Sequence, residues 1–104
     1  MPAIEKKKTL ILGASANPQR YSYLALNRLR NAGHEVVAIG RRNVLVENVQ
    51  IDTEQQPYTG IHTITLYLNP SHQEQYYDYI LSLHPQRIIF NPGAENETLR
   101  QLAE

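Results

Sequence analysis

Residues 9–20 read T-L-I-L-G-A-S-A-N-P-Q-R, and this stretch decides the fold that the sequence predicts. Residues 9–12 are almost wholly apolar, which is typical of a strand covered on both faces. The run passes directly into Gly13, a loop of small residues and Pro18, and a helical pattern follows. A buried strand that opens a helix in this way leaves backbone N–H groups pointing outward, where they bind anions and above all phosphate. We therefore expect a phosphate-binding turn here.

The helical pattern after this turn covers residues 21–32. Its spacing predicts an inward face made of Leu24, Ala25 and Leu29, extended by Tyr21 and Ala32. Gly33 occupies the position expected just after a helix end, and residues 35–39 form a second apolar strand. Strand, helix and strand within about 30 residues have the size of a βαβ unit, whose crossover is right-handed.

Residues 41–60 contain no long amphipathic helix, so this crossover is expected to be compact and irregular. The valines at 44, 46 and 49 predict a short hairpin, and the polar residues 52–56 one helical turn. Residues 61–68 predict a third strand, because Ile64, Leu66 and Leu68 alternate with Thr63, Thr65 and Tyr67. Ser71 and Glu74 have the spacing of a capping box, which predicts a helix over 73–83 with Tyr76, Ile80 and Leu83 on one face.

Residues 87–90 form a fourth strand, followed by a loop at 91–94 and a last helix over 95–103 with Leu99 and Leu102 inward. This order of elements predicts a single α/β domain with an open, doubly wound, mainly parallel sheet. In such sheets, ligands bind beyond the carboxyl ends of the strands. Four turns rich in Gly, Pro, Asn or Arg converge on that edge, at residues 13–20, 40–43, 69–70 and 91–94.

Composition limits the function classes. The chain has 104 residues, no cysteine and no apolar run near the roughly 20 residues that span a bilayer, so we expect one cytoplasmic domain without disulfide, thiolate or membrane. Residues 1–42 hold eight Lys or Arg against two acids, and residues 43–104 hold two against eight. Nucleic-acid binding needs a larger basic excess with interleaved aromatics, so Lys6, Lys7 and Lys8 are interpreted as a solvated surface.

The phosphate turn departs from the dinucleotide fingerprint G-x-G-x-x-G, because it reads G-A-S-x-x-P with Pro18 in the third glycine's place. Proline is tolerated at or near the first helical position. After the second strand, where NAD-binding folds have an acid, this chain has Gly40-Arg41-Arg42. An arginine pairs with a phosphate on the adenosine ribose, so the site suits coenzyme A (CoA) or NADP rather than NAD.

Three motifs resemble the family of small CoA-binding domains, which is related to the CoA-binding domain of the succinyl-CoA synthetase α-subunit. They are I-L-G-A-S-A-N-P at 11–18, A-G-H-E-V-V-A-I at 32–39 and N-P-G-A-E-N-E at 91–97. The resemblance implies a Rossmann-like fold in three α/β/α layers, with CoA lying across the strand ends.

The resemblance also implies a set of contacts. Phosphate groups would be held by Gly13, Ala14, Ser15 and Asn17, in the turn that ends at Arg20. The adenosine phosphate would meet Arg41 or Arg42, where the family usually has Asn-Pro. Asn91, Pro92 and Gly93 would line the wall near the pantetheine arm, and Asn69-Pro70 replaces the usual Arg-Pro. The chain ends at Glu104, before the final strand and cysteine often present in the family.

The sequence contains no recognisable catalytic constellation. Its four histidines, at 34, 62, 72 and 84, lie at element ends without metal-ligand spacing, and Asn96 and Glu97 fit the first turn of a helix. We therefore expect non-catalytic binding of CoA or an acyl-CoA. Two alternatives remain: a small NADP-dependent oxidoreductase, and a regulatory or scaffold protein that has kept the fold but lost the ligand, which Asn69 would favour. A protein partner or a homodimer is left open.

Overall fold

The computed structural model describes residues 7–104, and residues 1–6, which include Lys6, lie outside the described part. Its centre is a six-stranded sheet in the order β3-β4-β2-β1-β5-β6, parallel except for the β3–β4 pair. The strands are β1 (Thr9–Ala14), β2 (Val36–Gly40), β3 (Val44–Val46), β4 (Val49–Asp52), β5 (Thr63–Leu66) and β6 (Arg87–Phe90). The predicted open, mainly parallel α/β sheet is confirmed.

Strand β1 lies between β2 and β5 and pairs with both in parallel. Leu10, Ile11 and Leu12 have no exposed surface, as expected of a strand covered on both faces. The chain builds the sheet outward from β1 first through β2 and β4, and then crosses to β5 and β6 on the other side. The change of direction at β1 is the topological switch point, beside which ligands bind in open α/β sheets.

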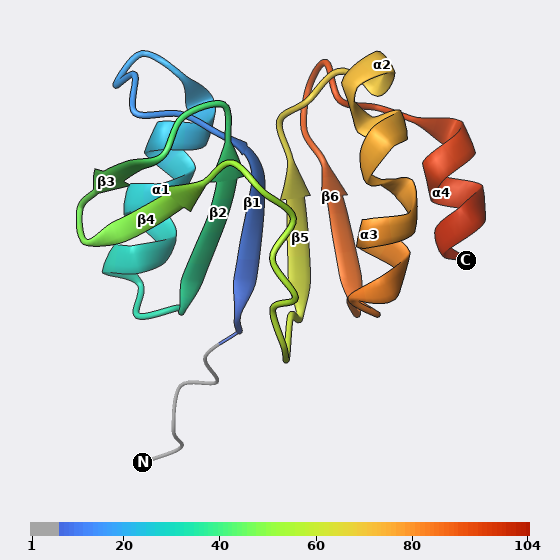
Figure 1. Cartoon of the computed structure of the whole chain (residues 1–104), viewed down its shortest axis with the longest axis horizontal. Helices are drawn as coiled ribbons and strands as arrows, with labels where there is room; N and C mark the ends of the chain where they lie inside the picture. The colour runs from blue at the N-terminus through green and yellow to red at the C-terminus, as the bar shows by residue number, and fades with distance from the viewer. Residues whose placement is uncertain (1–6) are drawn as a thin grey trace.

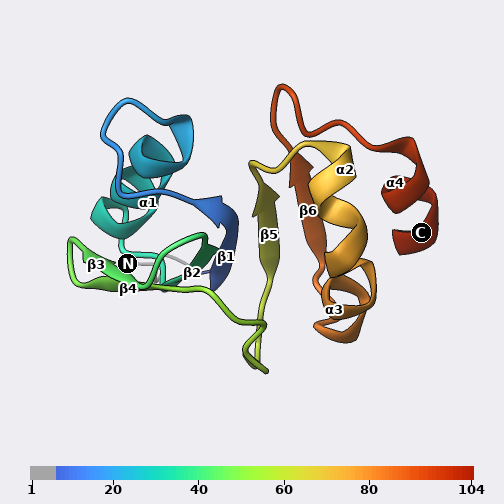
Figure 2. The same ribbon diagram turned by 45° about the horizontal axis from the view of Figure 1, so that its top comes forward.

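Helices lie on both faces of the sheet, which confirms the three-layer arrangement (Figures 1 and 2). They are α1 (Tyr21–Asn31), α2 (Pro70–Gln73), the 3-10 helix η1 (Glu74–Tyr76), α3 (Tyr77–Ser82) and α4 (Glu97–Ala103). Leu10 and Leu12 point to the face of α3 and α4, where they pack with Ile80 and Leu99. Ile11 points to the opposite face and packs with Leu26 of α1.

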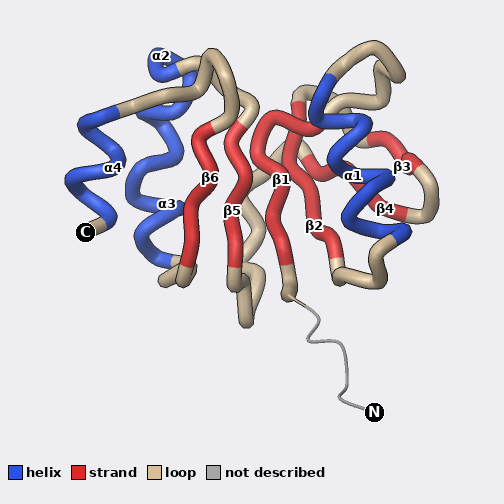
Figure 3. The backbone as a smooth tube through the Cα atoms, turned by 180° about the vertical axis from the view of Figure 1, so that it is seen from behind, coloured by secondary structure: helices blue, strands red, loops and turns tan. Residues whose placement is uncertain are grey.

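The buried face of α1 differs in part from the predicted one, since Leu29 packs against the core as predicted but other residues of the predicted face do not. Ser22 and Leu26 are buried, whereas Leu24 is 42% and Tyr21 79% exposed. Apolar residues surround this helix on more than one side, so the pattern alone does not choose the inward stripe. The choice is made by where α1 docks: it lies over β1 and β2 and not over β5 and β6 (Figure 3).

The predicted hairpin is confirmed as β3 and β4. Glu47 and Asn48 connect the two strands with φ of 48° and 68°, as a two-residue turn with both φ values positive requires. The helical turn predicted for residues 52–56 is wrong, because Asp52 pairs in β4 and the chain then runs in bends and extended backbone. Parallel pairing with β2 makes the hairpin an edge of the main sheet.

Two further predictions about helices are wrong. Asn69, not the Ser71–Glu74 capping box, caps α2: its Oδ1 accepts from His72 N at 3.1 Å, and Ser71 Oγ donates to the same oxygen at 2.6 Å. An Asn cap followed by proline at the first helical position moves the helix start to Pro70. In α4, Leu99 is buried as expected, but Leu102 is 51% exposed, because the short helix contacts the core on one side alone.

Gly40 should tolerate no side chain. A Cβ there would lie 2.3 Å from Ala14 O, a backbone atom of the paired strand β1, and 2.9 Å from Cγ2 of the buried Ile51. We expect Gly40→Ala to lower the free energy of unfolding by about 2 kcal/mol or more, measured by urea denaturation.

Gly60→Ala is the control for this prediction. Gly60 has φ of +70°, and no atom lies within 4 Å of the place that a Cβ would occupy. Alanine there would therefore meet no steric clash, and the substitution would cost only the strain of a positive φ. That cost is about 1 kcal/mol. Equal destabilisation by the two substitutions would contradict the steric role of Gly40.

Candidate functional site

Loops from four strands meet at the carboxyl edge of the sheet. The turn after β1 and residues 41–43 after β2 are neighbours, because Ala14 pairs with Gly40. The turn after β5 and residues 91–96 after β6 are neighbours in the same way, because Leu66 pairs with Phe90. All four loops lie at the top of the molecule in Figure 1 and come forward in Figure 2. The structure therefore brings together the four segments that the sequence analysis selected.

The turn after β1 is shaped by its own side chains. Ser15 Oγ accepts from Asn17 N at 3.0 Å, and Asn17 Oδ1 accepts from Gln19 N at 3.0 Å. Within residues 7–104, the amides of Ser15 and Ala16 donate no hydrogen bond. The two polar side chains thus fold the turn, and what the turn presents outward is backbone N–H.

Helix α1 adds an open N-terminus to this turn. Its N-cap is Arg20, which provides no side-chain cap, and its first turn carries no acid. The first N–H groups of a helix have no partner within it and carry partial positive charge, so an uncapped end favours an anion. Pro18 lies two residues before the N-cap and not at the first helical position, so it shapes the approach to the helix and not its first turn.

Gly13 closes the base of the turn. Its φ is +97°, and a Cβ there would lie 3.1 Å from the carbonyl carbon of Tyr67. The regular pairing of β1 with β2 shifts between Leu12 and Ala14, which marks an irregularity at Gly13. Glycine at this position lets the end of β1 approach the loop after β5 closely.

Positive charge lies beside the turn. Arg20, Arg41 and Arg42 are exposed, and none of them forms an ion pair with a carboxylate of residues 7–104. Arg41 and Arg42 follow Gly40 directly, and Gly40 is held against Ala14 O by the pairing of β1 and β2. The two arginines therefore follow a strand end that is held next to the turn after β1.

The amide side chains of the other two loops are engaged inside the protein. Asn91 Nδ2 donates to Thr65 Oγ1 and to Leu66 O, both at 2.8 Å, and so ties the end of β6 to β5. Asn69 is the α2 cap described above, with Pro70 after it. Pro92 and Gly93 are exposed, with Gly93 at φ of +89°. Pro92 and Gly93, together with the exposed Pro70, remain available to line a ligand.

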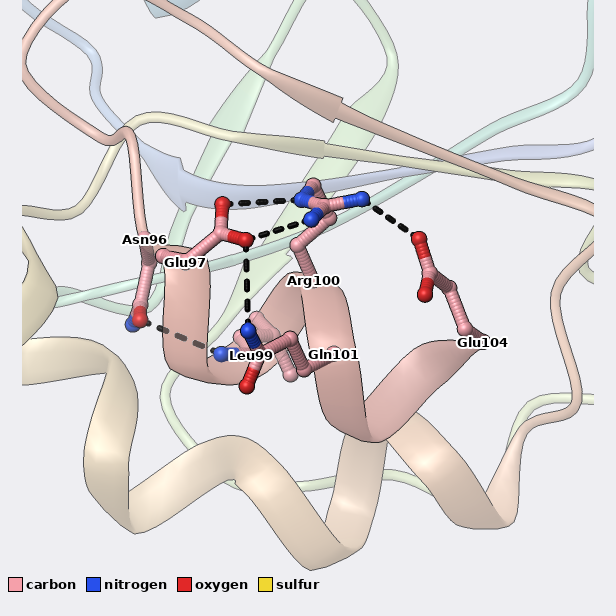
Figure 4. Close-up of polar contacts among 6 residues, drawn as sticks. All are labelled: Asn96, Glu97, Leu99, Arg100, Gln101 and Glu104. Atoms are coloured by element: carbon pink, nitrogen blue, oxygen red, sulfur yellow. Dashed lines mark hydrogen bonds and ion pairs between the residues drawn. The ribbon is translucent and has the colours of Figure 1, made fainter.

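Asn96 and Glu97 have the structural role that the sequence predicted. Asn96 Oδ1 caps α4 by accepting from Leu99 N at 3.1 Å, and Glu97 pairs with Arg100 in the same helix (Figure 4). The hydrogen bond from Arg100 holds the pKa of the Glu97 carboxyl below its usual range. The described residues contain no group of three or more His, Asp or Glu side chains placed to hold a metal ion.

Comparison with known proteins identifies the family of this chain. The family model of the CoA binding domain matches residues 7–104. The chain belongs to the family of CoA-binding domains. No curated protein matches it. No helix of the described residues has the length and apolar character needed to cross a membrane.

Three solved structures share the fold of this CoA-binding domain. An uncharacterised protein known from a crystal structure is 48% identical, with a TM-score of 0.91 over 95% of this chain and 82% of its own. A hypothetical protein from Pyrococcus horikoshii OT3 is 19% identical, with a TM-score of 0.82 over 94% and 70% of the two chains. A conserved hypothetical protein from Pyrococcus furiosus is 23% identical, with a TM-score of 0.80 over 93% and 84%.

Sequence reasoning missed one residue that shapes the site of this CoA-binding domain. Gln73 has no exposed surface, and its Nε2 donates to Leu68 O and Ala94 O, both at 2.7 Å. Its Oε1 accepts from Asn96 Nδ2 at 3.0 Å. Gln73 thereby links the loop after β5 to the loop after β6. A glutamine in a polar helical turn carries no sequence signal of burial, so only the tertiary structure identifies it.

We expect Gln73→Met to loosen these two loops. Methionine fills a similar volume but donates no hydrogen bond, so Leu68 O and Ala94 O lose their partner in the interior. Leaving a buried polar group unsatisfied costs about 1–3 kcal/mol. Urea denaturation should show a loss of about 2 kcal/mol or more, and hydrogen exchange should quicken in residues 91–96.

The matched control is Gln75→Met, because Gln75 is exposed in the neighbouring η1 turn. It should change the stability little. A Gln73→Met protein as stable as this control would contradict the linking role of Gln73.

Proposed function

We propose that this protein binds CoA or an acyl-CoA at the carboxyl edge of its sheet, in the cytoplasm, and carries out no reaction on it. The observation that carries the proposal is the pairing of Ala14 with Gly40. It puts a turn of unpaired N–H groups beside two exposed arginines, a combination suited to a ligand with phosphates at two places. Membership of the CoA-binding domain family supports the same ligand.

The diphosphate of CoA would lie on the turn after β1. The amides of Ser15 and Ala16 and the open N-terminus of α1 offer backbone donors, and Arg20 adds a positive charge at the helix start. Backbone donors at a helix N-terminus bind phosphate without the entropic cost of ordering a long side chain. Ser15 and Asn17 would act indirectly, by holding the turn in shape.

The phosphate on the adenosine ribose would meet Arg41 and Arg42. A guanidinium can donate two parallel hydrogen bonds to one phosphate, and such charge-assisted bonds are about twice as strong as neutral ones. Both side chains are exposed and without a described carboxylate partner, so binding would break no ion pair within residues 7–104. This contact would separate CoA from ligands that lack the extra phosphate.

The pantetheine arm would run from the switch point at β1 toward β5 and β6, along the wall formed by Pro92 and Gly93. Asn91 would support that wall through its bonds to Thr65 and Leu66 and would not donate to the ligand. The buried Gln73 would hold the same wall from behind. The arm is largely uncharged, and a wall of proline and glycine suits it.

The proposal of a binding protein and not an enzyme is supported by the histidines. His34 Nδ1 accepts from Lys7 N at 3.1 Å, and His62 Nδ1 lies 2.7 Å from Thr63 Oγ1 at the start of β5, the edge opposite the site. Within residues 7–104, no hydrogen bond joins a histidine side chain to a carboxylate. Neither of these two histidines therefore places a base against a nucleophile at the carboxyl edge of the sheet, which group transfer on a ligand bound there would need.

Titration calorimetry with CoA, dephospho-CoA and NADP tests the proposal. CoA should bind at least about tenfold more tightly than dephospho-CoA, because hydrogen bonds to a charged group contribute about 1.5–3 kcal/mol. NADP should bind more weakly than CoA, since it lacks the pantetheine arm. Equal binding of CoA and dephospho-CoA would contradict the role of the arginines, and no binding of either would favour a scaffold that has lost the ligand.

The double variant Arg41→Ala/Arg42→Ala should bind CoA more weakly, with dephospho-CoA little affected. The loss should be larger at low salt than at high salt, because screening already weakens an exposed charge pair. Arg30→Ala is the control, since Arg30 lies in the last turn of α1 at the opposite edge of the sheet. A salt-independent loss, or an equal loss in the control, would argue against direct phosphate contact.

A further inference from the structure

The face of the sheet that carries α1 is left without a helix over β5 and β6. From behind the molecule, α1 covers β1 and β2, while no helix covers β5 and β6 (Figure 3). Between α1 and these strands lies a groove of about 550 Å³, within the range of small-molecule sites. Its lining residues come from α1, from β1, β5 and β6, and from the loops that follow β5 and β6: Thr9, Tyr21, Leu24, Ala25, Arg28, Leu29, Thr63, Thr65, Tyr67, Arg87, Ile89, Asn91 and Pro92.

Helix α1 gives this groove an apolar wall. The stripe that the sequence pattern predicted as the inward face, Leu24, Ala25 and Leu29 with Tyr21, lines the groove, whereas Ser22 and Leu26 pack into the core. Leu24 is 42% exposed, and Ile89 on the facing strand is 36% exposed. The helix therefore carries a second apolar stripe that nothing in residues 7–104 covers fully.

The floor of the groove is less polar than its residue types suggest. Three threonines contribute to it, and each hydroxyl is engaged elsewhere. Thr9 Oγ1 donates to Lys7 O at 3.2 Å, Thr63 Oγ1 lies 2.7 Å from His62 Nδ1, and Thr65 Oγ1 accepts from Asn91 Nδ2 at 2.8 Å. With these hydroxyls satisfied, the floor suits methylene groups better than a polar ligand.

The two ends of the groove differ in chemistry. One end, at Tyr67, Asn91 and Pro92, lies at the carboxyl edge and is continuous with the wall of the candidate site. The other end holds Arg28 and Arg87 and lies at the start of β6, about 13 Å away along the strand. Neither arginine forms an ion pair with a carboxylate of residues 7–104.

We propose that this groove binds the acyl chain of an acyl-CoA whose far end carries a carboxylate. The inference rests on the proposed CoA binding and names the class of acyl group. The thioester would lie near Pro92, the methylene chain would pass between Leu24 and Ile89, and the terminal carboxylate would meet the arginines. Arg28 is the more specific of the two, because Arg87 also borders a smaller hollow of about 350 Å³ between α3, α4 and β6.

Titration calorimetry with CoA, octanoyl-CoA and octanedioyl-CoA tests the proposal. A fully buried methylene tightens binding about fourfold, so even in a half-open groove octanoyl-CoA should bind at least about tenfold more tightly than CoA. The terminal carboxylate of octanedioyl-CoA should add about fivefold more, as a charge-assisted pair at a partly exposed site. Octanoyl-CoA that binds no more tightly than CoA would overturn the proposal.

Three variants separate the contributions. Arg28→Gln should remove the tighter binding of octanedioyl-CoA relative to octanoyl-CoA. It should leave the ratio of the octanoyl-CoA and CoA affinities unchanged. Arg30→Gln on the same helix should change neither of these two affinity ratios. Ile89→Asp should abolish the tighter binding of octanoyl-CoA relative to CoA and leave the affinity for CoA itself unchanged. A carboxylate preference that survives Arg28→Gln and Arg87→Gln together would overturn the assignment of the arginines.

The competing occupant is a second copy of this chain. Light scattering of the wild type and of Ile89→Asp distinguishes it. A dimer that Ile89→Asp dissociates, with no dependence of affinity on acyl chain length, would overturn the acyl proposal. The same titrations distinguish a failure of this inference from a failure of the proposed function. Absence of binding by all three ligands would overturn both proposals. Tight binding of CoA with an affinity that does not depend on acyl chain length would overturn this inference alone.

Discussion

The structure depends on the burial of β1 between two parallel partners. Leu10, Ile11 and Leu12 lose all contact with water, so this strand must satisfy its backbone through β2 on one side and β5 on the other. Parallel pairing sends every neighbouring strand toward the same edge, and their loops must meet there. The position of the candidate site is thus a consequence of how the most apolar strand is covered.

At this edge the backbone segments approach each other so closely that two positions require glycine. Gly40 lies against Ala14 O, and Gly13 lies against Tyr67, so the turn after β1 is held from both sides by neighbouring backbone. Around it, Asn17, Asn69, Asn91 and Gln73 each use at least one side-chain polar atom in a hydrogen bond within the protein. These bonds hold the loops of this edge in place, and backbone N–H groups and exposed arginines lie beside them.

Helix α1 connects the two proposals. Its N-terminus follows the turn after β1, and its second apolar stripe lines the groove over β5 and β6. One helix would then contact two separate parts of the same ligand, the diphosphate at the helix start and the acyl chain along the helix side. This explains why the apolar pattern of α1 did not identify its buried face: Leu24 is apolar although it is exposed beside the groove, while the small Ser22 is buried where the helix approaches the sheet.

The sequence by itself determined the strands, the hairpin at Glu47 and Asn48, and the edge of the sheet at which the candidate site lies. Apolar runs and turn residues are local signals, so they can be recognised without the tertiary structure. Because the strands are parallel, the loops that follow them lie at the same edge. The sequence also indicated the ligand class, through the motifs at residues 11–18 and 91–97 and the arginines at 41 and 42. The tertiary structure alone decided which face of α1 is buried, that Asn69 and not Ser71 caps α2, and that Gln73 lies in the interior. These outcomes depend on distances between segments far apart in the chain, such as the 2.7 Å from Gln73 Nε2 to Ala94 O, which no local pattern of residues encodes.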